Sequence, residues 1–197
     1  MKRIFPLILC AGLSFAKAVD AHPHIFITNA VTFVFSGEIV TGLRLQWAFD
    51  EVFSSTIIAD FDRNGDGAFD AAEVAAIEDG AFANLEEYGY FTHLLIDGQA
   101  VPASEIREFS AARDGDQVVY SFFVPLPAPT DPRRTDLRAE IYDADYYVEI
   151  VLDPERPPTM EGEAEMPCGV TVTENKNAPY YFGLIHPEQI GLDCREG

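Results

Sequence analysis

Residues 25–49 read IFITNAVTFVFSGEIVTGLRLQWAF, and this stretch decides the fold class. β-branched and aromatic residues fill both halves, and a turn sequence, Ser36-Gly37-Glu38, separates them. In the second half Leu43, Leu45 and Trp47 recur at every second position, so they share one face. Alternation on either side of a short turn predicts a β-hairpin.

The apolar period changes directly after this hairpin. Phe53, Ile57 and Phe61 recur at four-residue steps, and Val74 and Ile77 continue at helical spacing beyond an acidic loop. Such spacing is typical of amphipathic helices. We therefore expect a helix-loop-helix insertion at about residues 49–86.

The remainder of the chain returns to short β-like stretches with turns between them. The expected strands are residues 90–96, 106–112, 118–126, 137–142, 146–152 and 170–173. Several short strands with frequent turns favour an antiparallel sandwich. We predict a mainly β chain: an antiparallel β-sandwich-like domain with an inserted EF-hand-type helix-loop-helix, forming one domain over residues 22–197.

The acidic loop between the two expected helices carries oxygen-bearing residues in a fixed order. Calcium takes six to eight oxygen ligands, and a twelve-residue EF-hand loop supplies them at set positions with a glycine at the sixth. The matching donors are Asp62, Asn64, Asp66, the backbone carbonyl of Ala68, Asp70 and Glu73, and Gly67 stands sixth. The order predicts one calcium site, structural and weak, on the order of 10⁻⁴ to 10⁻³ M, because no second loop pairs with it. The alternative is a solvated Asp/Gly turn.

The first 21 residues have the composition of a secretory signal. A basic start is followed by a short apolar stretch and then by Val19-Asp20-Ala21, which ends in a small residue. We expect cleavage after Ala21 and a periplasmic protein with no stable membrane anchor; a retained anchor is the alternative. Cys10 would leave with the signal, and Cys168 and Cys194 would form one disulfide in an oxidising compartment.

Composition and motifs narrow the function classes. The net charge is −20, which repels nucleic acid and attracts cations. No nucleophile elbow, P-loop, dinucleotide fingerprint or His-Glu-x-x-His motif is present. We therefore expect no enzyme activity and no nucleic-acid partner. The segment from Tyr142 to Tyr147 places two acids among aromatic residues, which indicates either a turn or the edge of a site.

Four histidines occur, and two of them flank Pro23 at the expected mature N-terminus. Imidazole and a free α-amine suit zinc, nickel or copper rather than calcium. His22, His24 and His93 are therefore candidate transition-metal ligands, and the alternatives are a solvated terminus and an ordinary strand histidine. A copper enzyme that uses the terminal histidine is a further, weaker hypothesis.

Five segments together resemble an uncharacterised exported family, the domain of unknown function 1007. They are His22-Pro23-His24, residues 47–54, 60–73 and 87–93, and the Tyr142–Tyr147 segment. The resemblance implies a periplasmic component of an ABC-type transport system, near transporters for nickel, cobalt or zinc. It implies no catalytic residues.

The leading hypothesis from the sequence is a periplasmic metal-binding accessory protein. It would hold one structural calcium ion and a zinc, nickel or copper ion, and it would serve an inner-membrane metal transporter. The alternative is a calcium-stabilised structural or interaction module with no transition-metal role.

Overall fold

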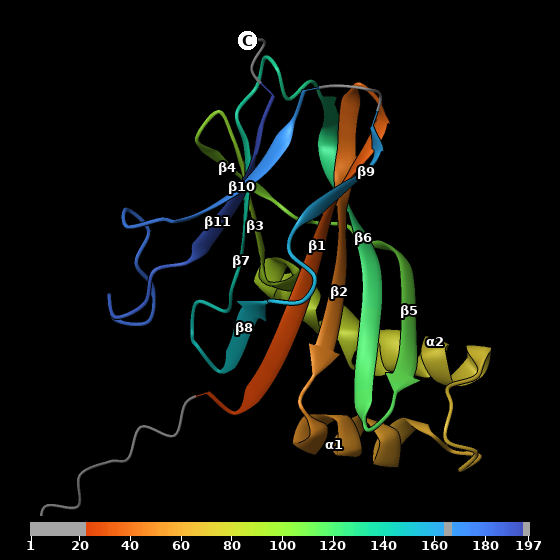
Figure 1. Ribbon diagram of the computed structural model, residues 1–197. Coiled ribbons are helices and arrows are strands. Elements are labelled where there is room, and N and C mark those ends of the chain that lie inside the picture. Colours follow the sequence, from red (N-terminus) through yellow and green to blue (C-terminus); the bar gives the residue numbers. More distant parts are fainter. Residues whose placement is uncertain (1–22, 164–166, 195–197) are drawn as a thin grey trace, which may run out of the picture.

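The computed structural model describes residues 23–163 and 167–194. This part of the chain is mainly β, with two antiparallel-rich sheets and three short helices (Figure 1). The predicted signal peptide, residues 1–21, and His22 lie outside the described residues. Among those that are described, no helix is long and apolar enough to span a bilayer.

The first sheet contains the predicted hairpin at its centre. Its strand order is β5-β6-β2-β1-β8, and β9 also pairs with β1. The bounds are β1 Ile25–Gly37, β2 Ile39–Phe49, β5 Arg107–Asp114, β6 Gln117–Thr130, β8 Val148–Leu152 and β9 Thr159–Glu163. β1 and β2 are antiparallel, with Phe33 opposite Leu43 and Val31 opposite Leu45.

Two pairings in this sheet are parallel, which corrects the expectation of a purely antiparallel fold. β8 lies beside the first half of β1 and β9 beside its second half, both in the same direction as β1. The preceding strand, β7, belongs to the other sheet. The chain therefore reaches β1 by a crossover and not by a hairpin, and a crossover permits parallel pairing. β9 falls in a Pro/Glu-rich stretch where we expected a loop.

The second sheet has the order β10-β11-β7-β3-β4. Its strands are β3 Thr92–Ile96, β4 Gln99–Pro102, β7 Leu137–Ile141, β10 Gly169–Glu174 and β11 Glu188–Asp193. The predicted disulfide is present: Cys168 precedes β10 and bonds to Cys194 just after β11. The disulfide joins the start of β10 to the end of β11, where Gly169 pairs with Asp193.

One hydrophobic cluster draws side chains from both sheets. Phe33 and Trp47 enter it from the first sheet, and Leu94, Leu137 and Ile190 enter it from the second. All five are at most 1% exposed. A core shared by two sheets is what a sandwich-like arrangement requires.

The helices are α1 Glu51–Phe61, α2 Ala71–Gly80 and the 3₁₀ helix η1 Phe82–Phe91. Asp50 holds α1 in place, because its carboxylate accepts from the first-turn amides of Val52 and Phe53 and from the β1 amide of Phe26. Ser54 is fully buried and accepts from the β6 amide of Val118 at 2.8 Å. α1 is thus tied to both neighbouring strands.

The strand expected at residues 90–96 begins later than predicted. Tyr90 and Phe91 have φ values of 50° and 52°, which is the left-handed region. Because that conformation breaks the extended backbone of a strand, β3 begins only at Thr92.

Candidate functional site: an acidic loop and an apolar cavity

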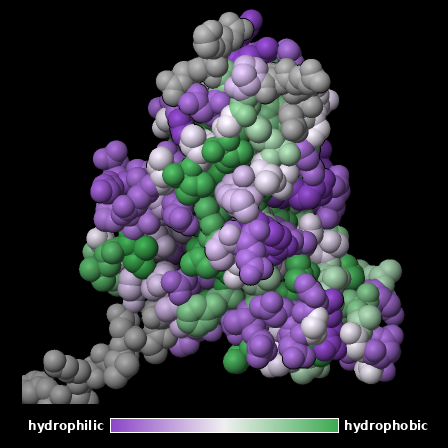
Figure 2. Space-filling model, viewed as in Figure 1, coloured by the Kyte–Doolittle hydropathy of each residue, from purple (hydrophilic) through white to green (hydrophobic). Residues whose placement is uncertain are grey.

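Residues 62–70 join α1 to α2, at the end of the first sheet where Figure 1 places both helices. The surface over these helices is largely hydrophilic (Figure 2). Asp62 opens the loop and folds over it: Oδ1 accepts from the Gly65 amide at 2.8 Å and Oδ2 from the Gly67 amide at 3.1 Å. Both glycines have positive φ values, 70° and 86°, and glycine adopts this backbone region without the steric cost of a Cβ atom.

The next polar side chains repeat the same local pattern. Asn64 Oδ1 accepts from the Asp66 amide at 2.7 Å, and Asp66 Oδ1 accepts from the Ala68 amide at 2.9 Å. Side chains that accept from an amide two residues later make Asx-turns, which hold a tight loop without regular structure. Hydrogen bonds between the loop's side-chain oxygens and its own backbone amides therefore hold its conformation.

Glu73 closes the loop from the first turn of α2. It is only 5% exposed, and its Oε1 accepts from the amides of Arg63 at 2.8 Å and Asn64 at 3.3 Å. Oε2 accepts from the Asp70 amide at 3.0 Å. Asp70 in turn caps α2 through the amides of Ala72 and Glu73, so the two acids form a capping box. The buried Glu73 carboxylate is satisfied by three backbone amides, and it joins the start of the loop to the first turn of α2.

The described residues contain no group of three or more His, Cys, Asp or Glu side chains arranged to hold a metal ion. In the loop, the oxygens of Asp62, Asp66 and Glu73 are directed to backbone amides. The structure therefore has the predicted donors in the predicted order between two helices, but it does not show them converging as an EF-hand.

The positively charged side chain of Arg113 also lies against this loop. A Cβ placed on Gly67 would stand 3.3 Å from Nη1 of Arg113, near the end of β5. The Nε of Arg113 is buried and has no hydrogen-bond partner. The guanidinium therefore supplies positive charge to the acidic loop from outside it.

The candidate transition-metal ligands lie in different settings. His24 is exposed, and its ring packs on Tyr147 with centroids 4.7 Å apart. His93 is half-buried and stacks on Tyr142 at 4.0 Å, with Nε2 3.1 Å from the Tyr142 carbonyl oxygen. Burial lowers the pKa of His93, while the Tyr142 carbonyl and the charges of Glu140 and Asp143 act in the opposite direction. His22 lies outside the described residues, so the three-histidine set remains a prediction.

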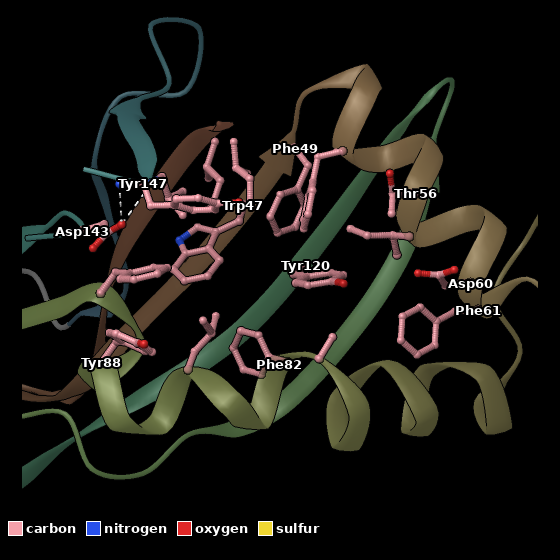
Figure 3. A pocket seen from close by; sticks show the side chains of 18 of the residues that line it. Trp47, Phe49, Thr56, Asp60, Phe61, Phe82, Tyr88, Tyr120, Asp143 and Tyr147 are labelled. Atoms are coloured by element: carbon pink, nitrogen blue, oxygen red, sulfur yellow. Dashed lines mark hydrogen bonds between the residues drawn. The ribbon is translucent and has the colours of Figure 1, made fainter. Parts of the chain in front are cut away.

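An apolar cavity of about 570 Å³ lies between α1, η1 and the first sheet. In Figure 3 it extends from Asp143 and Tyr147 at one end to Asp60 and Phe61 at the other, with Tyr120 and Phe82 between them. Its lining residues are Ile25, Ile27, Trp47, Phe49, Phe53, Thr56, Ile57, Asp60, Phe61, Ala81, Phe82, Leu85, Tyr88, Phe91, Tyr120, Asp143, Asp145, Tyr147 and Val148. Aromatic rings dominate this lining, and three carboxylates stand at its ends.

Trp47 contributes an unpaired donor to this region. The side chain is fully buried, and its indole Nε1 has no hydrogen-bond partner. Its ring packs at 4.8 Å on Phe122 and at 6.0 Å on Phe82. In the view of Figure 3, the indole nitrogen is on the edge of the ring that is nearer to Asp143. A buried N–H group without an acceptor costs about 1–3 kcal/mol, so it calls for an explanation.

Asp143 belongs to the segment between β7 and β8 that the sequence marked as a turn or a site edge. The segment forms a turn. The Asp143 carboxylate accepts from the amides of Asp145, Tyr147 and Val148 at 2.9 to 3.0 Å, and it also lines the cavity. The cavity as a whole was missed, because its walls come from distant parts of the chain. The dense aromatic content of residues 47–53, 82–91 and 142–147 was the available signal.

Comparison with known proteins identifies relatives. A family model described as "Protein of unknown function (DUF1007)" matches residues 7–181. An "Uncharacterized 15.5 kDa protein in trpE 3'region" of Spirochaeta aurantia is 29% identical over 131 residues, which are 66% of this chain and 93% of that protein. An "Uncharacterized protein" of Haemophilus influenzae is 29% identical over 142 residues, 71% of this chain and 67% of that protein. Because the family model spans most of its length, the chain belongs to the DUF1007 family.

Proposed function

We propose that this chain is an exported accessory protein, not an enzyme, whose loop from Asp62 to Glu73 binds one calcium ion. The observation that carries the proposal is Glu73, a nearly buried carboxylate that is folded back over the start of the loop. Glu73 also holds the loop folded through these amides and the capping box with Asp70. Its place in the sequence is the twelfth position of the loop, where a calcium loop needs an acid.

The chemistry of the donors fits calcium. Asp62, Asn64, Asp66, Asp70 and Glu73 supply hard side-chain oxygens, and Ala68 supplies a carbonyl. When bound, calcium would give the loop the positive charge that these acids lack among themselves. Arg113 opposes binding, since its guanidinium already lies against the loop. The Arg113 guanidinium therefore favours a weak calcium site over a tight one.

Export and partnership follow from indirect support. The Cys168–Cys194 disulfide is typical of an oxidising compartment such as the periplasm. The signal-like residues 1–21 favour the same location. We propose a periplasmic role beside an inner-membrane metal transporter, as the family resemblance implies.

The transition-metal role is a second proposal with narrower support. His24 and Pro23 are the last residues before β1, so a metal held by His22 and His24 would sit at the start of the first sheet. His93 is the weaker candidate, because one ring nitrogen already contacts the Tyr142 carbonyl. Zinc, nickel or copper at His22 and His24 would then need another ligand.

Native mass spectrometry of residues 22–197 tests both proposals in one experiment. We expect one calcium ion per chain in a titration, and we expect Glu73→Gln to lose it while Asp79→Asn, an exposed acid on the same helix, retains it. The same protein is titrated with zinc, nickel and copper, with His24→Ala as the variant. Absence of calcium at millimolar concentration would overturn the first proposal, and equal transition-metal binding by His24→Ala would overturn the second.

A further inference from the structure

The apolar cavity has the size and composition of a small-molecule site. Ligand pockets enclose about 300–1,000 Å³ and combine a mainly hydrophobic lining with a few well-placed polar groups. This cavity measures about 570 Å³ and is lined by nine aromatic side chains, from Trp47 to Tyr147. It is separate from the acidic loop, although Asp60 and Phe61 at the end of α1 lie just before that loop in the chain.

The unpaired indole of Trp47 indicates what is missing. An indole N–H only donates, so the missing partner must be an acceptor. The floor around Trp47 is built from Phe49, Phe82 and Phe91, each at most 6% exposed and without side-chain acceptors. A molecule that entered the cavity could supply the acceptor that the protein lacks.

Asp143 selects among the acceptors. It lines the same cavity and is 5% exposed, and its backbone amide bonds keep its carboxylate oriented. A carboxylate ligand would be repelled by this acid and by the net charge of −20. An ammonium ligand would pair with Asp143, but it could not accept from Trp47. A hydroxyl does both, since it accepts one hydrogen bond and donates another.

We propose that this cavity binds an apolar alcohol or phenol. Its hydroxyl accepts from Trp47 Nε1–H and donates to the Asp143 carboxylate, and its apolar body lies along Tyr120 and Phe82 between α1 and η1. The proposal does not depend on calcium. It therefore stands or falls separately from the calcium-binding function.

The tryptophan itself gives the first test, because Trp47 is the only tryptophan in the chain. Its emission is measured during titration with three probes of equal chain length: octan-1-ol, octylamine and sodium octanoate. We expect saturable change with octan-1-ol, at an affinity about tenfold or more above that of octanoate, which corresponds to one extra hydrogen bond to a buried group. Equal responses to alcohol and carboxylate, tighter binding of the amine, or no saturable response to the alcohol would overturn the proposal.

A matched pair of variants on α1 places the binding site. Thr56 lines the cavity and Ser55 does not, and both hydroxyls donate to the Val52 carbonyl. We expect Thr56→Phe to fill the cavity and weaken octan-1-ol binding about tenfold or more, and Ser55→Phe to stay within about twofold. Equal effects of the two variants would show that the alcohol binds elsewhere.

Trp47→Phe tests the hydrogen bond, with calorimetry as the readout because the variant lacks the fluorophore. Phenylalanine retains a six-membered aromatic ring but lacks the five-membered ring of the indole and its N–H. We expect octan-1-ol to bind about tenfold more weakly than to the unsubstituted protein, because its hydroxyl loses one hydrogen bond, with the circular dichroism spectrum unchanged. If the variant does not fold, Asp143→Asn serves instead, since it retains the shape of the side chain and removes the charge that rejects octanoate. Unchanged octan-1-ol affinity in a folded Trp47→Phe protein, or a preference for octan-1-ol over octanoate that survives in Asp143→Asn, would contradict the assigned contacts.

Discussion

The acidic loop and the apolar cavity both border α1, but their polar groups are satisfied in opposite ways. In the loop, Asp62, Asn64 and Glu73 accept from amides a few residues away or across the loop. In the cavity, the Trp47 indole has no partner at all. A loop can bend its own backbone toward a carboxylate, whereas a side chain fixed on the central strand β2 cannot move to an acceptor. The difference teaches that the loop can remain folded without a ligand, whereas the cavity contains a buried hydrogen-bond donor that has no acceptor.

The largest expected effect separates the cavity from the surface around it. Phe82 is 1% exposed and packs on Trp47, Phe109 and Phe122. Phe82→Ala should lower the free energy of unfolding by about 3–5 kcal/mol, because a large ring is lost from the core. Urea denaturation followed by circular dichroism measures this. Tyr88→Ala, in the same helix but 50% exposed, is the control and should cost clearly less. Equal losses would mean that η1 is not packed as described.

The next effect tests whether the loop is self-supporting. Glu73→Ala removes the acceptor of the Arg63, Asn64 and Asp70 amides. In calcium-free buffer we expect a loss of about 1–3 kcal/mol of unfolding free energy, because partly buried donors become unpaired. Asp79→Ala, at an exposed position of α2, should stay within about 0.5 kcal/mol. A Glu73→Ala protein that is as stable as the Asp79→Ala protein would show that the loop is not held by these bonds.

Alkaline pH should affect the cavity and leave the loop unchanged. Burial raises the pKa of Tyr120 well above its ordinary value of 10.0. Above pH 10 the unfolded chain therefore releases this proton while the folded protein keeps it, so stability falls as pH rises. The limit for one group is about 1.4 kcal/mol per pH unit. We expect the unfolding free energy of Tyr120→Phe, measured by urea denaturation, to fall less steeply above pH 10 than that of the unsubstituted protein. Equal slopes for the two proteins would contradict the burial of the Tyr120 hydroxyl.

The smallest effect concerns the cation beside the loop. Arg113→Met removes a positive charge next to Gly67 but retains an unbranched apolar stem. A competing charge near a partly exposed site is worth about 0.4–1 kcal/mol, so calcium affinity should rise about two- to fivefold. Calorimetric titration checks this, with Arg134→Met, an 85% exposed arginine on the loop before β7, as the control. A decrease in affinity would place Arg113 in support of the ion.

The sequence predicted the elements whose signals are contiguous. The β1–β2 hairpin is confirmed by its register, and the Cys168–Cys194 disulfide by its geometry. Both depend on local period or on an even count of cysteines. α1 and α2 were expected from the three- and four-residue spacing of their apolar residues, and the structure shows that Asp50 and Asp70 cap them.

What the sequence could not predict depends on contacts between distant segments. The parallel pairing of β8 and β9 with β1 arises from a crossover between sheets, and strand spacing does not reveal it. The cavity joins side chains from β2, η1 and the segment after β7, such as Trp47, Leu85 and Asp143. An unpaired indole is visible only when its neighbours are known. The acidic loop has the reverse character: its motif is plain in the sequence, but side-chain convergence on an ion is not shown by the fold.

One measurement tests the central claim that the loop from Asp62 to Glu73 binds calcium. A ¹H–¹⁵N correlation spectrum of residues 22–197 resolves the Gly65 and Gly67 amides and the single indole N–H of Trp47. Calcium should shift the two glycine amides, which donate to Asp62, and leave the indole signal in place. Octan-1-ol should do the reverse. Glycine amides that do not move at millimolar calcium, or that move equally with magnesium, would contradict the account.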